Sequence, residues 1–343
     1  MSIYLLRRLN LLIATSVLLL IVIFSISYQF PGERHYVLTG ISDPTPQQLL
    51  EIDQDYALDK GIVRQFLAYS QQRLSGEFGI SINSQQPVID EMKLAIPASF
   101  ELTSMAVLVA LLFGIPLGVI AARSSNKMLQ NAILAATLSG YSVPVFWLGI
   151  TLSLWFGLQL NLLPINGRIN LLYDIEPVTG LLLVDCLLSD ASYKMAAFYD
   201  ALRHLILPTL TLAVLPFTMV IRITRDAMIT IMKQNYIKAA ESRGLTSLQI
   251  IVRHALPNAV IPVVRTFGIM LGTIATYSII TEVIFAWPGM GSWLVSAIFQ
   301  RDYTVIQGGI LVTSIFIIFS TITIEVIHHM VNPSSRKEMY GAH

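Results

Sequence analysis

The stretch NYIKAAESRGLTSLQIIVRHALPN, residues 235–258, is a polar interruption in an apolar chain. Its first part, residues 236–243, consists of good helix formers. Gly244 follows, and glycine most readily takes the left-handed conformation that closes a helix. Thr246 then predicts an N-cap, because Gln249 three residues later completes a capping box. We therefore expect two short helices joined at Gly244, and we call residues 235–258 the elbow.

The second helix of the elbow is expected to be amphipathic and to end near Pro257. A hydrophobic staple across the cap is expected between Leu245 and Ile250. The predicted apolar face consists of Leu248, Ile251, Val252 and Ala255. A solvated basic loop that only fixes topology needs neither caps nor an apolar face. The elbow is therefore predicted to offer a surface to a partner.

Apolar runs lie on both sides of the elbow and recur along the chain. The 343 residues are 54% hydrophobic and 13% charged, whereas a soluble domain has about 25% charged residues. The mean hydropathy is +0.66. A membrane-spanning helix needs about 20 apolar residues, and six segments satisfy this length. We predict an all-α integral membrane protein with six transmembrane helices. The predicted spans are 9–28, 98–122, 131–160, 204–224, 258–284 and 304–327.

Several predicted spans contain residues that are unusual in soluble helices. The third span is longer than a bilayer requires, so either Pro144 kinks it or its last turns leave the membrane. Glycine and proline occur in FGIPLG at 113–118 and LPTLTLAVLP at 207–216. Such residues are tolerated where neighbouring helices pack closely. The spans are therefore expected to form a bundle.

The distribution of Lys and Arg predicts the orientation. Basic residues precede span one, follow span six, and lie between spans two and three and between spans four and five. The positive-inside rule then places both termini and the elbow in the cytoplasm. An uncleaved first span is expected rather than a signal peptide. The acidic region 29–97 is predicted to lie outside, either as a loop packed on the surface or as a small substructure with Ile62, Phe66 and Tyr69 on one helix face.

The chain lacks the motifs of catalysis. It contains no phosphate loop, dinucleotide fingerprint, zincin motif or serine-hydrolase elbow, so we expect neither an enzyme nor a cofactor in this chain. The lone Cys186 excludes an internal disulfide. The ionisable residues Glu101, Arg265, Glu282 and Glu325 lie away from the midplanes of the predicted spans. This placement argues against an ion-coupled secondary transporter. A structural ion pair between Arg265 and Glu325 is one expectation.

The elbow resembles the EAA loop of binding-protein-dependent ABC transporter permeases. That pattern is E-A-A, three residues, G, nine residues, I, one residue, L-P. The matching positions are Lys238, Ala239, Ala240, Gly244, Leu256 and Pro257. The departures are Lys238 in place of the usual Glu and His254 at the Ile position.

Further segments resemble the dipeptide and oligopeptide permeases, the DppB/OppB-like subfamily. These segments are 203–228, 253–264 and 281–311, the last with W-P-G-x-G and R-D-Y elements. More narrowly, three segments resemble the B permeases of Sap peptide-transport systems, whose members also carry K-A-A in this loop. They are 141–156, 163–181 and 332–340. The resemblance covers spans two to six and the N-terminal LLRRLNLLI, and it is weakest over 29–97.

The resemblance implies a type I ABC importer permease fold whose elbow contains a coupling helix. In that family the loop contacts a cytoplasmic ATPase, so the six matching elbow residues would lie at or beside this contact, with Leu256 and Pro257 fixing the exit into span five. The implied domains are residues 1–97, with one span and an external segment, a permease domain at 98–330, and a cytoplasmic tail at 331–343.

The implied partners are a second homologous permease subunit, two cytoplasmic ABC ATPase subunits that bind ATP and Mg, a periplasmic substrate-binding protein and the lipid bilayer. No nucleic acid is expected. The implied location is a bacterial inner membrane. The implied cargo is a peptide, including antimicrobial peptides. Polyamines or other cationic solutes, moved in either direction, remain an alternative within the same architecture, and a secondary transporter is the alternative from another class.

Overall fold

The structure, a computed structural model, describes residues 2–29 and 34–331 and is elongated and helical. Its five long helices are each long and apolar enough to cross a membrane. They are α1 (Ser2–Gln29), α5 (Val88–Arg123), α9 (Lys194–Met232), α12 (Leu256–Ile284) and α14 (Tyr303–Val331). They contain the predicted first, second, fourth, fifth and sixth spans. The predicted tail beyond Val331 lies outside the described residues.

The predicted third span is broken. Helix α6 (Lys127–Ser142) is followed by α7 (Val145–Leu152) and the π-helix η1 (Ser153–Gln159), and the two parts are bent by 102°. Pro144 is the N-cap of α7 and has no amide hydrogen to continue the ladder of α6. The predicted kink is therefore confirmed. If the bent pair forms one span, the part of the chain that the structure describes contains six.

Small residues bring α5 and α9 into close contact. A Cβ atom at Gly114 would lie 2.9 Å from Val220 Cγ1, and a Cβ atom at Gly118 would lie 2.6 Å from Thr224 Cβ. Gly114 and Gly118 are four residues apart and share a face of α5, the arrangement that lets membrane helices approach closely. The glycines of the FGIPLG segment thus hold the centre of the bundle together, as the predicted close packing requires.

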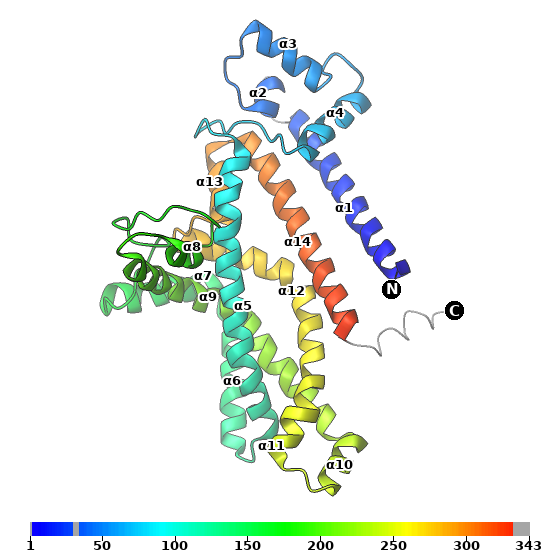
Figure 1. The fold of residues 1–343 in the computed structure, drawn as a ribbon, viewed down its shortest axis with the longest axis vertical. Helices are drawn as coiled ribbons and strands as arrows, with labels where there is room; N and C mark the ends of the chain where they lie inside the picture. Colours follow the sequence, from blue (N-terminus) through cyan, green and yellow to red (C-terminus); the bar gives the residue numbers. More distant parts are fainter. Residues whose placement is uncertain (1, 30–33, 332–343) are drawn as a thin grey trace.

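The two ends of the molecule carry different short elements (Figure 1). At one end lie α10 (Asn235–Ser242) and α11 (Ser247–Ile250). At the opposite end lie α2 (Arg34–Thr39), α3 (Pro46–Asp55) and α4 (Ile62–Leu74). Within the external region, residues 34–87 therefore form a helical substructure rather than only a surface loop. Tyr69 is buried as predicted, whereas Ile62 is exposed because it begins α4 beyond the packed turns.

This substructure is fastened to the beginning of α14. The Gln307 side chain donates to the Val37 carbonyl at 3.2 Å and accepts from the Tyr69 hydroxyl at 3.2 Å. The Asp302 carboxylate accepts from the Ser81 hydroxyl at 2.7 Å. All of these polar groups except the Val37 carbonyl belong to buried side chains, so each bond satisfies a group that would otherwise lie unpaired in the interior. The R-D-Y element thus helps to anchor residues 34–87.

One predicted ion pair involves a different partner. Glu325 on α14 pairs with Arg8 on α1 at 2.9 Å, whereas the Arg265 side chain is exposed. Helix α1 packs beside α14, which brings Arg8 to Glu325. The expected ion pair between Arg265 and Glu325 is therefore wrong. Glu325 pairs with Arg8 instead, and this pair attaches the first span to the last.

Two further short helices, α8 (Leu182–Leu188) and α13 (Met290–Gln300), were not expected from the sequence. Helix α8 buries Cys186 against Ala197 and Ala201 of α9. Burial raises the pKa of the Cys186 thiol, and the nearby carboxylates of Glu101 and Asp185 raise it further. The thiol is therefore protonated at neutral pH, and only the thiolate reacts readily.

Cys186 is accordingly expected to react with a maleimide at pH 7 at least about tenfold more slowly than an exposed thiol, and completely after unfolding in detergent. Its neighbour Leu187 is half exposed, so Leu187→Cys in a Cys186→Ala background supplies the matched exposed thiol. Labelling is followed by the mass of the intact protein. Equal rates for the two cysteines would show that Cys186 is accessible.

Candidate functional site

The turn at the centre of the elbow has the predicted geometry. Gly244 has φ +77°, and its amide donates to the Glu241 carbonyl at 2.9 Å. The amide of Leu245 reaches back to the Ala240 carbonyl at 3.3 Å. These bonds satisfy carbonyl groups at the end of α10. A Cβ atom at position 244 would meet nothing within 4 Å, so the need for glycine comes from backbone conformation alone.

The predicted cap is also present. The Thr246 hydroxyl accepts from the Gln249 amide at 3.3 Å, and the Gln249 side chain accepts from the Thr246 amide at 2.9 Å. This reciprocal pair is the capping box. Leu245 and Ile250, the predicted staple, pack in the same apolar cluster. The beginning of the second helix is therefore fixed by local sequence.

The predicted end of the second helix is wrong. The chain continues from α11 through a π-helix, η2 (Ile251–Ala255), directly into α12, so the helical run extends from Ser247 to Ile284. The amide of Leu256 bonds to the Ile251 carbonyl across the wide turn, and Pro257 lies in the first turn of α12. Proline is tolerated there because its missing amide hydrogen is not needed.

One face of the elbow is packed against the spans. Met228 of α9, Ile237 and Ala240 of α10, Ile250 of α11 and Ala259 of α12 form one buried cluster. Arg123 at the end of α5 adds a hydrogen bond to the Ser247 hydroxyl at 2.5 Å. The elbow is therefore attached to three of the long helices, and a force applied to it would be transmitted to all three.

The predicted apolar face divides into a buried part and an exposed part. Ala255 is buried and Ile251 is half-buried, whereas Leu248 is 70% exposed and Val252 is 53% exposed. Ile250 takes the inward position, and residues two places away on a helix point about 200° from it. Sequence periodicity could not reveal this division, because it does not show which side of the helix packs against the spans.

The six predicted coupling residues occupy different environments. Lys238, Ala239, Gly244 and Pro257 are exposed, Leu256 is half-buried, and Ala240 is buried against the spans. Ala240 therefore allows α10 to pack closely on α9 and α12 rather than offering a contact. We define the elbow surface by five of the exposed side chains on α10, α11 and η2. These are Tyr236, Lys238, Ala239, Leu248 and Val252.

A second polar cluster lies at the other end of α12 and was not recognised from the sequence. The Glu282 carboxylate is 1% exposed. It accepts hydrogen bonds from the hydroxyls of Ser99 (2.7 Å) and Ser278 (2.9 Å). It also accepts from the amides of Gly291 (2.7 Å) and Ser292 (3.1 Å), at the first turn of α13. A negative group suits this position because helix N-termini carry unpaired N–H groups and a partial positive charge.

The W-P-G-x-G element provides the space for this carboxylate. A Cβ atom at Gly289 would lie 2.6 Å from Glu282 Cδ, and a Cβ atom at Gly291 would lie 2.9 Å from Glu282 Oε2. The Trp287 indole donates to the Ala98 carbonyl at 2.9 Å. The motif therefore joins the ends of α5 and α12 to the beginning of α13. The spacing of Glu282 from the two glycines is the feature of the sequence that could have predicted this buried cluster.

Glu101 forms an ion pair at the same end of the bundle. Its carboxylate pairs with Arg168, which also lies 5.4 Å from the centre of the Trp287 ring, and it accepts from the Leu183 amide at 2.9 Å. Arg168 comes from the long connection between η1 and α8, which this pair holds against α5 and the Trp287 element. The carboxylates of Glu101 and Glu282 thus both have structural partners.

A cleft of about 710 Å³ lies beside the beginning of α9. Two of its charged side chains form hydrogen bonds to the segment between η1 and α8, which forms one wall of the cleft. Asp200 accepts from the Asn170 amide at 2.7 Å, and Arg203 donates to the Leu162 carbonyl at 2.6 Å. These contacts shape the wall of the cleft.

Comparison with known proteins gives consistent results. Residues 114–337 match the family described as binding-protein-dependent transport system inner membrane component. The chain is 38% identical to the di/tripeptide transport system permease protein DppB of Pseudomonas aeruginosa (strain UCBPP-PA14), covering 97% of this chain and 98% of that protein. It is 39% identical to the putrescine export system permease protein SapB of Escherichia coli (strain K12), covering 99% of both chains.

A solved structure resembles the fold. The inward-facing MetNI methionine ABC transporter aligns with a TM-score of 0.52 and 17% identity, covering 69% of this chain and 94% of that chain. At this identity the likeness concerns the fold alone. With the helices described above, it confirms the predicted all-α permease fold.

Proposed function

Because the chain belongs to the family of binding-protein-dependent transport system inner membrane components, we propose that it forms one half of the translocation path of an ABC transporter for peptides. Its elbow would receive the motion of a cytoplasmic ATPase. The observation that supports this most strongly is the elbow itself, which is packed on three spans yet leaves Leu248 and Val252 uncovered. Exposed aliphatic side chains beside a fixed scaffold are typical of a protein contact.

The orientation follows from this assignment. With the elbow in the cytoplasm, the substructure at the opposite end of the molecule lies outside, consistent with the basic loops beside the elbow (Figure 1). Both termini are then cytoplasmic and the membrane is a bacterial inner membrane. The proposed partners are a second permease chain, two ATPase subunits that bind and hydrolyse ATP, and a periplasmic binding protein.

Two cargo classes are supported by the relatives. Peptides are the leading proposal, because the Pseudomonas relative is named for di- and tripeptides. Polyamine export is the second, because the relative from E. coli K12 is named for putrescine. Mass spectrometry of the ligand retained by the binding protein encoded beside this gene would separate them. A peptide supports the first cargo class, and the absence of any retained peptide together with putrescine efflux supports the second.

The elbow contact can be tested by cross-linking. In a Cys186→Ala background, Leu248→Cys is expected to cross-link to the ATPase subunit in the assembled transporter, because residue 248 lies on the elbow surface. The measurement is the mobility and mass of the cross-linked product with a short linker that carries a maleimide for residue 248 and a photoreactive group for the partner chain. A nucleotide-dependent yield is expected, since ATP binding would move the two subunits relative to each other.

Leu50→Cys on α3 is the matched control, because Leu50 is a leucine of similar exposure at the opposite end of the molecule. It should give no ATPase product. Equal yields from both positions, or no product from Leu248→Cys in a complex that hydrolyses ATP, would exclude the elbow surface as the contact.

A further inference from the structure

Helix α4 carries a stripe of aliphatic side chains that no described part of the chain covers. Val63, Leu67 and Leu74 are 68%, 60% and 77% exposed. At about 100° per residue, these three side chains lie within about 40° of one another around the helix. Arg64 and Gln71 lie on the other side of the stripe, so the stripe separates them from the packed face of α4. A compact aliphatic sector on a short helix outside the spans is therefore left without a partner among residues 2–29 and 34–331.

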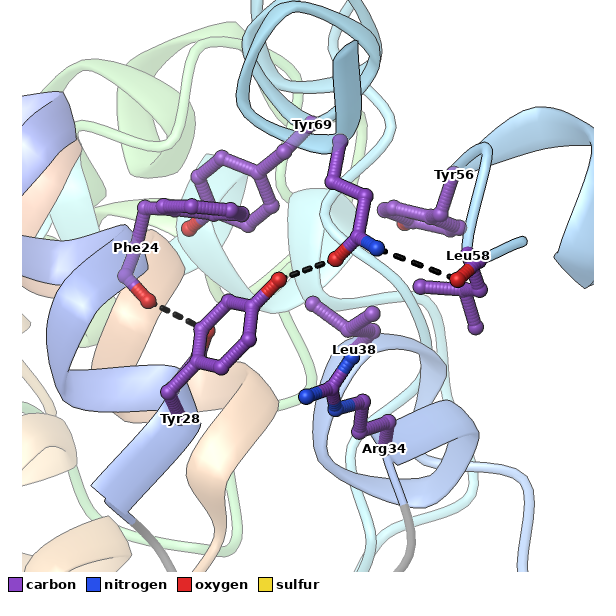
Figure 2. A pocket seen from close by; sticks show the side chains of 9 residues that line it. Phe24, Tyr28, Arg34, Leu38, Tyr56, Leu58 and Tyr69 are labelled. Atoms are coloured by element: carbon purple, nitrogen blue, oxygen red, sulfur yellow. Dashed lines mark hydrogen bonds between the residues drawn. The ribbon is translucent and has the colours of Figure 1, made fainter. Parts of the chain in front are cut away.

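The rotation of α4 is fixed, so the stripe cannot turn inward. Figure 2 shows Phe24, Tyr28, Tyr56 and Tyr69 around the pocket where α4 meets α1. The Gln65 side chain accepts from the Tyr28 hydroxyl and donates to the Leu58 carbonyl at 3.0 Å. The pocket has a volume of only about 20 Å³, enough for about one water molecule. It therefore serves as the packed joint between α4 and α1.

This joint places α4 at the end of the apolar stretch of α1. That stretch runs from Leu6 to Tyr28, and the Phe24 ring within it lies 5.5 Å from the ring of Tyr69 on α4. Val22 and Ile26, each two residues from Phe24 along α1, have exposed apolar side chains that would face lipid when α1 spans a bilayer. The stripe of α4 therefore lies at the level where hydrocarbon gives way to headgroups.

The charges of the substructure are unevenly distributed. Helix α4 contains no acidic residue and exposes Arg64, whereas α3 exposes Glu51, Asp53 and Asp55. Figure 1 shows α3 farther from the spans than α4. An exposed arginine beside an aliphatic stripe suits a helix that lies on anionic lipid.

We propose that α4 is an interfacial helix, with Val63, Leu67 and Leu74 inserted among phospholipid acyl chains just below the headgroups. The occupant of the stripe is the bilayer that α1 already spans. Because the same substructure is bonded to α14 through Gln307, the membrane contact sets the height and tilt of the bundle relative to the bilayer. It thus gives the external end of the permease a fixed platform.

Spin labels attached to single cysteines test this placement in the assembled transporter, reconstituted in vesicles of phosphatidylethanolamine and phosphatidylglycerol. The background is Cys186→Ala, and the labelled positions are Leu67→Cys and Leu74→Cys. Both labels are expected to be relaxed several-fold more strongly by oxygen, which concentrates in lipid, than by a water-soluble nickel chelate. Ile26→Cys on α1 provides the reference for a lipid-facing site.

Gln71→Cys is the matched control on the same helix, and its label should be relaxed more strongly by the nickel chelate. All of these positions except the half-exposed Ile26 are well exposed, so the labels leave the packed face of α4 intact. Strong relaxation of the Leu67 and Leu74 labels by nickel would show that the stripe faces water and is open to a soluble partner. Protection of both labels from oxygen and nickel would show that another protein chain covers it. Either result would overturn the proposal.

Discussion

Replacing Glu282 by alanine is expected to produce the largest loss of stability of any single substitution in this chain. The change removes the acceptor of two hydroxyl and two backbone N–H groups in the interior. The hydroxyls of Ser99 and Ser278 can rotate toward other acceptors, but the amides of Gly291 and Ser292 cannot. A buried donor left unpaired costs about 1–3 kcal/mol, so the two amides together cost about 2–6 kcal/mol. The measurement is the thermal midpoint of the purified transporter in detergent.

Two further variants show whether the hydrogen bonds are the cause. Ser278→Ala removes one of the four donors and leaves the others paired, so its midpoint should fall much less. Glu282→Gln keeps the shape but loses one acceptor oxygen, and it should lie between the wild-type protein and Glu282→Ala. A Glu282→Ala variant as stable as Ser278→Ala would contradict the assignment of this carboxylate as the joint between α12 and α13.

Gly244→Val is expected to separate ATP hydrolysis from transport. Gly244 has φ +77°, and a β-branched residue in this region is strained by about 1–3 kcal/mol. Because no atom would meet the new Cβ, the strain acts through the backbone of the elbow turn alone. If the turn shifts and the ATPase contact loses about 1–2 kcal/mol, coupled transport falls about tenfold. The measurement is the ratio of cargo transported to ATP hydrolysed in vesicles.

Gly76→Val is the matched control for this experiment. Gly76 has φ +90° and no atom within 4 Å of a Cβ position, but it lies in the substructure at the other end of the molecule. It should carry similar backbone strain and leave the ratio unchanged. Gly244→Asn should also retain coupling, because asparagine tolerates the left-handed region. Normal coupling in Gly244→Val would exclude the elbow turn as a transmission element.

Short sequence patterns predicted those parts of the fold that depend on interactions between residues close together in the chain. Long apolar runs gave the spans, Pro144 gave the bend, and the Thr246–Gln249 pair gave the cap of α11. These features depend on residues close together in the chain. The end of the second elbow helix was missed because the π-helix at 251–255 leads directly into α12, with Pro257 in the first turn of α12. The residue types at 251–255 do not predict a π turn.

Contacts between distant residues could not be predicted in the same way. Ser99 and Glu282 are separated by 183 positions, and Arg8 and Glu325 by more than 300. Each pair depends on how the helices pack, which the hydropathy pattern of one helix does not determine. The same limit applies to Ala240 and Ala239, which are adjacent small residues. The packing of α10 decides that one is buried and the other is exposed.

The most direct test of the central claim is transport by the reconstituted complex. Vesicles containing this chain, its partner permease and both ATPase subunits, supplied with the loaded binding protein, should accumulate cargo only when ATP can be hydrolysed. Vesicles with this chain alone should show no uptake when a proton or sodium gradient is imposed. Gradient-driven uptake by the isolated chain, without ATPase subunits, would contradict the account and indicate a secondary transporter.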